Sequence, residues 1–291
     1  MRALAGFIMR GRSQAVLVAS LGALLPGLIW VSGAVIALFA LRKGWREGLL
    51  IIVFTAGVCA LGLTLLGGLP QQVLRPALEL WLPVLLVAGW LRASVSLSST
   101  LQLLAGLGVL TVLGLYLLVP EPEAYWAAQF EQMRQLLEVG EADWAMLREQ
   151  IVPIMSGLWA VNLMLLVLIG LLLGRWWQAL LFNPGGFRQE FHGLRLDWRL
   201  AVLALALWVA SAFTGPGLVN DLGLVLSGIF LFQGLSLIHA VGAARDWGRG
   251  WFVLLYVLLP LILQILMAVG MGDAIFNWRR RLMGSDGGPS A

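Results

Sequence analysis

The most constraining feature of this chain is a series of long apolar segments between Ser13 and Gly272, interrupted once by an acidic stretch at Glu121–Gln150. Four segments contain no Asp, Glu, Lys or Arg: Leu97–Val119, Ile151–Gly174, Leu222–Ala244 and Gly250–Gly272. In lipid, backbone polar groups must be paired internally, so such runs are helices or strands of a closed barrel. Barrel strands alternate polar and apolar residues over about 10 positions, and these runs do not. The pattern therefore predicts membrane-spanning helices.

Four further stretches complete the series. Gly48–Leu69 and Leu200–Gly217 are long enough to span, whereas Val73–Leu91 is interrupted by charged residues and prolines, and Ser13–Leu41 contains Pro26-Gly27 near its middle. Only 12% of the residues are charged, about half the share of a soluble domain, roughly 25%. We therefore predict an all-α fold: one integral membrane domain over residues 1–282, a polytopic helical bundle of about seven to nine apolar segments, with a disordered tail at 283–291.

The chain contains none of the common catalytic or metal-binding motifs. With two histidines and one cysteine, no Cys/His metal set can be built, and His-Glu-x-x-His, Gly-x-Ser-x-Gly and P-loop motifs are missing from the sequence. Ser236 with His239 is the nearest approach to a catalytic pair. The net charge of +4 is spread over the loops, which is typical of a topology signal rather than a nucleic-acid patch. We expect no enzymatic activity, metal, cofactor or nucleic-acid partner.

The loop charges predict an orientation, because short basic loops stay in the cytoplasm. Segments 1–13, 42–47 and 175–199 are basic, whereas 121–150 holds seven acidic residues and two arginines. A single kinked span at 13–41 would separate the first two basic segments. We favour two short helices, Ser13–Leu24 and Gly27–Leu41, in a turned pair. This arrangement predicts a bacterial inner-membrane protein with a cytoplasmic N-terminus, a cytoplasmic loop at 175–199 and an external insertion at 121–150.

The C-terminal arginines do not fit this scheme. Arg279, Arg280 and Arg281 follow the last span and would lie outside, unless one segment fails to cross. The prolines and charges of Val73–Leu91 make it the first suspect.

The acidic insertion is predicted to be helical and amphipathic. Trp126, Phe130, Met133 and Leu137 recur at i, i+4, i+7 and i+11, with polar residues between them. The sequence leaves two alternatives open: a helix lying flat on the bilayer surface, or a lid over an outward-facing cavity.

Polar residues inside apolar segments are candidates for a solute-binding site, since buried polar groups in a bilayer are costly. The candidates are Glu79, Asn220, Asp221, Gln233, Ser236 and His239. Hydrogen bonding between helices is the alternative use of such residues, and Glu79 could instead pair with Arg75, four residues earlier.

Two features predict docking surfaces. One is a stripe of small residues on the first apolar helix, Ala15, Ala19 and Ala23, which lets another helix approach closely, from this chain or from another subunit. The other is the turn predicted in the loop at 175–199, together with the first residues of a short amphipathic helix after it: Asn183, Pro184, Gly185, Gly186, Phe187 and Arg188.

The stretch from Gly174 to Leu196, and above all its Asn-Pro-Gly-Gly-Phe-Arg segment, resembles the cytoplasmic loop of the YybS-like family of bacterial membrane proteins. The closing Gly272–Arg281 segment is also similar to that family. That family is in turn distantly similar to the S components of energy-coupling-factor transporters, which bind a small solute and carry a small-residue stripe on their first helix. The resemblance implies a small-solute-binding membrane protein. The alternative is a non-transporting scaffold or assembly factor acting through its cytoplasmic loop. The expected partners are the lipid bilayer, a membrane or cytoplasmic protein, and a small solute.

Overall fold

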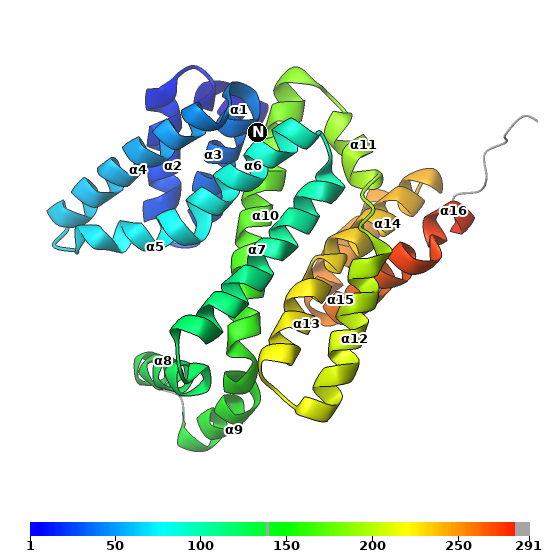
Figure 1. Cartoon of the computed structure of the whole chain (residues 1–291). Coiled ribbons are helices and arrows are strands. Elements are labelled where there is room, and N and C mark those ends of the chain that lie inside the picture. Colours follow the sequence, from blue (N-terminus) through cyan, green and yellow to red (C-terminus); the bar gives the residue numbers. More distant parts are fainter. Residues whose placement is uncertain (138–139, 283–291) are drawn as a thin grey trace, which may run out of the picture. The chain divides into compact units, whose positions relative to one another are not determined.

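The computed structural model describes residues 1–137 and 140–282, which fold into helices without strands. The chain divides into two compact units (Figure 1). Unit 1 contains Met1–Leu104 and Leu163–Phe191, and unit 2 contains Ala105–Asn162 and the chain from His192 onward. The tail at 283–291, predicted to be disordered, lies outside the described residues.

Unit 1 is built around α3, whose residues from Ser32 to Leu41 are all buried. The close approach of α10 contributes to this burial. A Cβ at Gly174 would lie 2.7 Å from the carbonyl oxygen of Ala34, so only glycine fits at position 174. The helices of this unit are α1 (Arg2–Ile8), α2 (Arg12–Leu24), α3 (Ile29–Lys43), α4 (Trp45–Leu65), α5 (Leu74–Pro76), α6 (Leu82–Ser94), the start of α7 (Leu97–Leu118), most of α10 (Met155–Phe182) and most of α11 (Gly186–His192).

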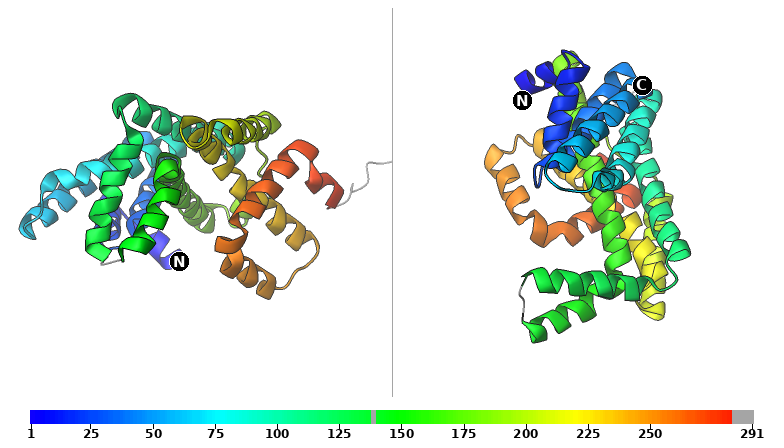
Figure 2. Two further views of the ribbon diagram at one scale, coloured as in Figure 1. Left: turned by 90° about the horizontal axis from the view of Figure 1, so that it is seen from below. Right: turned by 90° about the vertical axis from the view of Figure 1, so that its left-hand side faces the viewer.

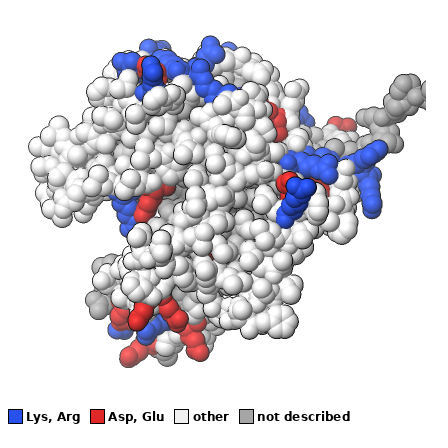
Figure 3. Space-filling model, in the orientation of Figure 1, with Lys and Arg blue, Asp and Glu red and all other residues white. Residues whose placement is uncertain are grey.

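The Ser13–Leu41 segment forms a helical hairpin, as the loop charges led us to expect. Helices α2 and α3 pack against each other and are joined by a turn in which Gly27 has φ +75°. The hairpin brings its two ends together, since the Arg12 guanidinium donates to both carboxylate oxygens of Glu47 over 2.6 and 2.9 Å. The basic segments 1–13 and 42–47 therefore lie at one end of unit 1, where Figure 3 shows arginine and lysine gathered.

The weakest predicted span is a continuous but irregular helix. Pro70–Ser94 begins with a 3₁₀ turn (Pro70–Val73) and contains a π turn at Ala77–Trp81. Pro83 explains the π turn, because proline has no N–H to donate and its ring clashes with the carbonyl four residues earlier. Trp81 is anchored in the core by a hydrogen bond from its Nε1 to Ser32 Oγ over 2.8 Å.

Unit 2 contains the acidic insertion and the C-terminal helices. Its helices, besides the remaining parts of α7, α10 and α11, are α8 (Pro122–Leu137), α9 (Glu141–Ile151), α12 (Trp198–Thr214), α13 (Leu218–Gly228), α14 (Phe230–Ala244), α15 (Arg249–Phe276) and α16 (Trp278–Leu282). Helices α12 and α13 pack together, and α14 and α15 pair along most of their shared length.

The insertion forms a helical hairpin whose apolar side is covered by protein. Figure 2 shows α8 and α9 side by side. Phe130 of α8 stacks on Trp144 of α9 with ring centroids 4.1 Å apart, and Trp126 Nε1 donates to Ser156 Oγ of α10 over 2.9 Å. These contacts bury Trp126 and Phe130, so this part of the predicted apolar stripe packs on α9 and α10, whereas Met133 is 43% exposed. The outer surface of the hairpin carries the acidic residues (Figure 3). The side chain of Leu137 lies outside the described residues.

Six described helices are long and apolar enough to span a membrane, which does not confirm the expected count of seven to nine apolar segments: Trp45–Leu65, Pro70–Ser94, Leu97–Leu118, Trp144–Phe182, Leu218–Ala244 and Arg249–Phe276. The turn at Gly27 leaves α2 and α3 with 13 and 15 residues, about 20 Å each and short of the roughly 30 Å hydrocarbon core. Trp198–Thr214 is an apolar helix of 17 residues. The α15 surface remains largely uncovered, with Leu261 80% exposed. Six such helices are compatible with a multi-pass membrane protein.

Candidate functional site

The polar residues of α14 belong to a buried hydrogen-bond network in unit 2. Gln233 and Ser236 are fully buried. Gln233 Nε2 donates to Oδ2 of Asp273 on α15 over 2.9 Å, and Gln233 Oε1 accepts the backbone N–H of Leu196 over 2.9 Å. Arg279 Nη2 of α16 donates to Ser236 Oγ over 3.1 Å. This network, named here the Gln233–Asp273–Arg279 network, joins α14, α15, α16 and the segment that precedes α12.

Asp273 and Arg279 form the charged centre of the network. Asp273 is 1% exposed, and its Oδ1 accepts the Arg279 backbone N–H over 3.0 Å. Asp273 Oδ2 lies 3.6 Å from Arg279 Nη2, and Arg279 Nη1 donates to the backbone carbonyl of His192. Burial lowers the pKa of Arg279, the Asp273 carboxylate raises it, and the nearby Arg195 lowers it again. Because an arginine pKa starts far above neutrality, the Arg279 guanidinium stays charged and forms a salt bridge with Asp273.

Two glycines and one left-handed residue bring these side chains together. A Cβ at Gly234 would lie 2.1 Å from the carbonyl oxygen of Leu266, and one at Gly270 would lie 2.0 Å from that of Phe230. The backbones of α14 and α15 therefore touch, as small residues allow in membrane helices. Asn277 has φ +52°, which ends α15 and turns α16 back toward α14.

The network shows where the C-terminal arginines lie, which the loop charges left open. The favoured topology would put Arg279–Arg281 opposite the loop at 175–199, yet Arg279 donates to the His192 carbonyl of that loop. The reason is that Gln233, midway along Leu218–Ala244, contacts both segments. It accepts a hydrogen bond from Leu196 of the loop and donates one to Asp273 in the last turns of α15. The C-terminal arginines and this part of the loop thus share one end of unit 2. Val73–Leu91, the first suspect, lies within a continuous helix.

His239 belongs to an aromatic cluster on the α14–α15 hairpin. Its Nε2 shares a 2.9 Å hydrogen bond with the hydroxyl of Tyr256, and its ring stacks on Phe252 with centroids 4.6 Å apart. The ring of His192 lies 6.4 Å away. The Ser236 hydroxyl, by contrast, accepts a hydrogen bond from Arg279. Both members of the candidate catalytic pair thus have partners in neighbouring helices.

Asp221 forms a second buried polar cluster in unit 2. It is fully buried, and its Oδ2 accepts a hydrogen bond from the hydroxyl of Tyr116 on α7 over 2.8 Å. Its Oδ1 lies against the backbone of Gly157 in the first turn of α10, where a Cβ would come within 2.8 Å of that oxygen. Asp221 Oδ1 and Asn220 Nδ2 are buried and have no partner of ordinary hydrogen-bond geometry among the described residues, although the Asn220 amide and the Gly157 backbone lie close enough to interact with the Asp221 carboxylate.

Glu79 is separate from the other predicted solute ligands. It lies in unit 1, whereas the other five lie in unit 2. Both of its carboxylate oxygens accept from Arg75 Nε over 3.1 Å, and the Arg75 side chain is 73% exposed. The i,i+4 surface pair, the alternative drawn from the sequence, is the observed one.

Two pockets of unit 2 are lined by residues outside the predicted solute set. One, of about 380 Å³, lies between α8, α9 and the 3₁₀ turn Val152–Ile154 that precedes α10, and it is lined in part by Glu123, Arg148 and Glu149. The other, of about 520 Å³, lies where α15 meets α16.

The small-residue stripe of α2 is used within the chain. Ala15 and Ala19 are fully buried in unit 1, and Ala23 is half-buried. Helix α2 packs on α3 and α4, and a Cβ at Gly22 would lie 3.0 Å from the backbone nitrogen of Ser32. The close approach that the stripe permits is therefore an intrachain contact, and Ala15 and Ala19 are not available to a separate subunit.

The predicted docking turn is exposed and tightly folded. Asn183, Pro184, Gly185 and Arg188 are exposed, and Gly186 and Phe187 are half-buried. Gly185 has φ +89°, and the Asn183 amide folds over Gly186 so closely that a Cβ there would meet it. An ion pair between Arg175 of α10 and Glu190 of α11 ties the following helix to the bundle, and Phe187 stacks on Phe191.

Asp273, Arg279 and Tyr116 are the functional candidates that the sequence analysis missed. Asp273 and Arg279 lie in the closing segment that supports the family resemblance. Gln233 is 40 residues from Asp273, so no local sequence pattern indicates that the two side chains meet. An acid inside an otherwise apolar helix was the one available signal. Tyr116 lies near the end of an apolar span, where a tyrosine ordinarily indicates interfacial anchoring.

Comparisons of the chain with protein-family models, curated proteins and solved structures found no match. The YybS-like resemblance remains a prediction from the sequence.

Proposed function

We propose that this protein is a multi-pass membrane scaffold or assembly factor that binds a partner protein through the exposed turn at Asn183–Arg188. We place it in the bacterial inner membrane, with the N-terminus and this turn in the cytoplasm. The observation that carries the proposal is that the turn is both exposed and fixed in shape. Gly185 (φ +89°) permits the tight bend, and the Asn183 amide over Gly186 and the Arg175–Glu190 ion pair restrict the conformation of the turn. A preformed surface loses less conformational entropy on binding.

Two of the predicted solute ligands are hydrogen-bonded within the chain, which also supports a scaffold. Gln233 and Ser236 are engaged by Asp273, Leu196 and Arg279, which is the hydrogen bonding expected between packed membrane helices.

One observation favours the solute-binding alternative, in which the protein resembles a transporter S component. Asp221 Oδ1 and Asn220 Nδ2 are buried in a span with no partner of ordinary hydrogen-bond geometry among the described residues, and their nearest polar neighbours are each other and the Gly157 backbone. Such groups are costly and often mark a ligand or ion pathway. A polar solute that bonded to both groups would satisfy them.

Site-specific photo-crosslinking in intact membranes tests the scaffold proposal. A photoreactive residue replaces Arg188, and a second variant carries it at Val95, which is 80% exposed in another turn of unit 1. We expect a defined crosslinked partner from position 188, absent at position 95 and lost when Gly185→Val disrupts the left-handed turn. Identical crosslinks from both positions, or crosslinks that survive Gly185→Val, would refute the proposal.

Native mass spectrometry of the purified protein separates the two functions. A bound non-lipid small molecule that is lost in Asp221→Ala and retained in Glu79→Gln would establish the solute-binding alternative and remove the scaffold as the primary function. Its absence, with the crosslink at position 188 present, supports the scaffold.

A further inference from the structure

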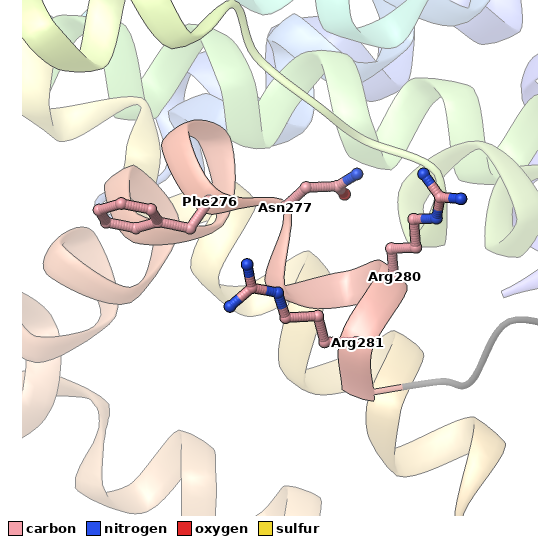
Figure 4. Close-up of a pocket in the computed structure, with 4 residues that line it drawn as sticks. All are labelled: Phe276, Asn277, Arg280 and Arg281. Atoms are coloured by element: carbon pink, nitrogen blue, oxygen red, sulfur yellow. The ribbon is translucent and has the colours of Figure 1, made fainter.

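The pocket at the junction of α15 and α16 combines two cationic side chains with an exposed aromatic ring. It has a volume of about 520 Å³ and is lined by Phe276, Asn277, Arg280 and Arg281. Figure 4 shows the Asn277 amide between the guanidinium groups of Arg280 and Arg281 in that view, with Phe276 on the side toward Arg281. The left-handed conformation of Asn277 (φ +52°) makes the sharp turn that opens this pocket between the two helices.

The pocket lies at the end of an apolar helix, where a lipid headgroup is expected. Helix α15 is 28 residues long and ends at Phe276, whose side chain is 57% exposed. Phe276 stacks on Trp278 with ring centroids 6.2 Å apart. Aromatic residues beside basic residues at the end of a span are characteristic of the membrane–water interface. The guanidinium groups that follow would therefore lie at the depth of the phosphates.

The positive charge around the pocket exceeds the available negative charge. Arg279 points inward and is paired with Asp273, whereas the exposed Arg280 and Arg281 make no ion pair within residues 1–137 and 140–282. Arg195 lies near enough to Arg279 to lower its pKa. Because the Asp273 carboxylate is engaged by Arg279, the two outward arginines have no acidic partner among the described residues and can face an anion from the surroundings.

We propose that this pocket binds the phosphate group of an anionic phospholipid. Arg280 and Arg281 donate to the phosphate oxygens, for which the planar guanidinium group is well suited. The Asn277 amide adds a neutral donor, and Phe276 packs against the glycerol and upper acyl region. A volume of about 520 Å³ is within the range of about 300–1,000 Å³ that holds small ligands. Arg279, whose side chain is 13% exposed, ties α16 to Asp273 and Ser236, so the backbone that carries the other two arginines is positioned before the lipid binds.

Native mass spectrometry of the full chain tests this proposal. The protein is equilibrated in detergent micelles that contain equal amounts of phosphatidylglycerol and phosphatidylcholine, and the bound lipid is counted. We expect phosphatidylglycerol to be retained over phosphatidylcholine. The variant Arg280→Gln/Arg281→Gln should bind phosphatidylglycerol at least about tenfold more weakly, since each arginine near an anionic headgroup contributes roughly a fivefold factor. The control variant Arg245→Gln/Arg249→Gln removes two exposed arginines from the other end of the α14–α15 hairpin and should retain the lipid.

Two results would overturn the proposal. One is equal retention of the two lipids, and the other is equal loss of phosphatidylglycerol in both double variants, which would indicate a general charge effect. Inorganic phosphate separates a lipid from a free anion. If millimolar phosphate displaces phosphatidylglycerol completely and raises the melting temperature of the wild type alone, the pocket is a free-phosphate site and the lipid assignment is wrong. Far-ultraviolet circular dichroism confirms that both double variants are folded.

Discussion

Replacing Asp273 with asparagine is expected to destabilise unit 2 by about 3 kcal/mol. The carboxylate accepts from the Arg279 backbone N–H and from Gln233 Nε2 and lies 3.6 Å from the Arg279 guanidinium. Asparagine offers one oxygen and one NH₂ group, so one of these donors would face another donor. Breaking a buried ion pair costs about 3–5 kcal/mol. The lower value applies here because Arg279 keeps its hydrogen bonds to Ser236 and His192.

A double-mutant cycle isolates the ionic contribution from other effects. Arg279→Gln leaves the buried Asp273 carboxylate without its counter-ion and should cost a similar free energy. The double variant Asp273→Asn/Arg279→Gln removes both charges, so it should be more stable than the sum of the single effects predicts, by roughly 1–3 kcal/mol. Glu79→Gln is the matched control, because its partner Arg75 is 73% exposed and such surface pairs contribute about 0–1 kcal/mol.

Thermal unfolding of the purified protein in detergent, followed by tryptophan fluorescence, measures these effects. A loss of about 3 kcal/mol corresponds to a fall of roughly 6–12 °C in melting temperature for a domain of this size. A melting temperature of Asp273→Asn within the error of wild type would refute the network. Strict additivity of the two substitutions would show that the two side chains do not interact.

Three further predictions use the same assay or limited proteolysis. Gly270→Ala should destabilise the protein by about 1–3 kcal/mol, because its Cβ would lie 2.0 Å from a carbonyl oxygen of α14, whereas Gly250→Ala, with no atom within 4 Å, should not. Trp126→Ala should release the α8–α9 hairpin, seen as faster protease cleavage in the acidic insertion than in wild type; unchanged cleavage would contradict the packing described. Tyr116→Phe should lower stability by about 1–3 kcal/mol, since it removes the 2.8 Å hydrogen bond from the Tyr116 hydroxyl to the buried Asp221 carboxylate, and a neutral effect would show that this oxygen has another partner.

The sequence predicted helices and turns well where local physical chemistry decides them. Uncharged runs such as Leu97–Val119 could only be helices in lipid, and Pro26-Gly27 between two basic segments indicated the α2–α3 hairpin. The amphipathic period of Trp126 and Phe130 identified α8. The sequence could not show that α9 and α10, rather than lipid, would cover the apolar side of α8, because periodicity shows that a face is apolar and not what covers it.

The candidate site was predicted in part. Gln233 and Ser236 were recognised as polar residues at membrane depth, but their partners Asp273 and Arg279 were missed. The inward direction of Arg279 depends on the left-handed Asn277, and the contact with α14 depends on the facing glycines of α14 and α15. Neither can be read from the spacing of polar residues, so a network assembled from distant segments is invisible in the sequence.

By itself, the sequence determined that this chain is helical, where its apolar segments lie and which loops carry the charge, because each of these follows from the chemistry of neighbouring residues. Only the tertiary structure decided which polar side chains meet. It separated Glu79 from the network, placed Arg279 beside the loop at 175–199 and left Arg280 and Arg281 facing outward. The physical reason is that a buried charge must find its partner wherever the fold brings one within reach, whatever the distance along the chain.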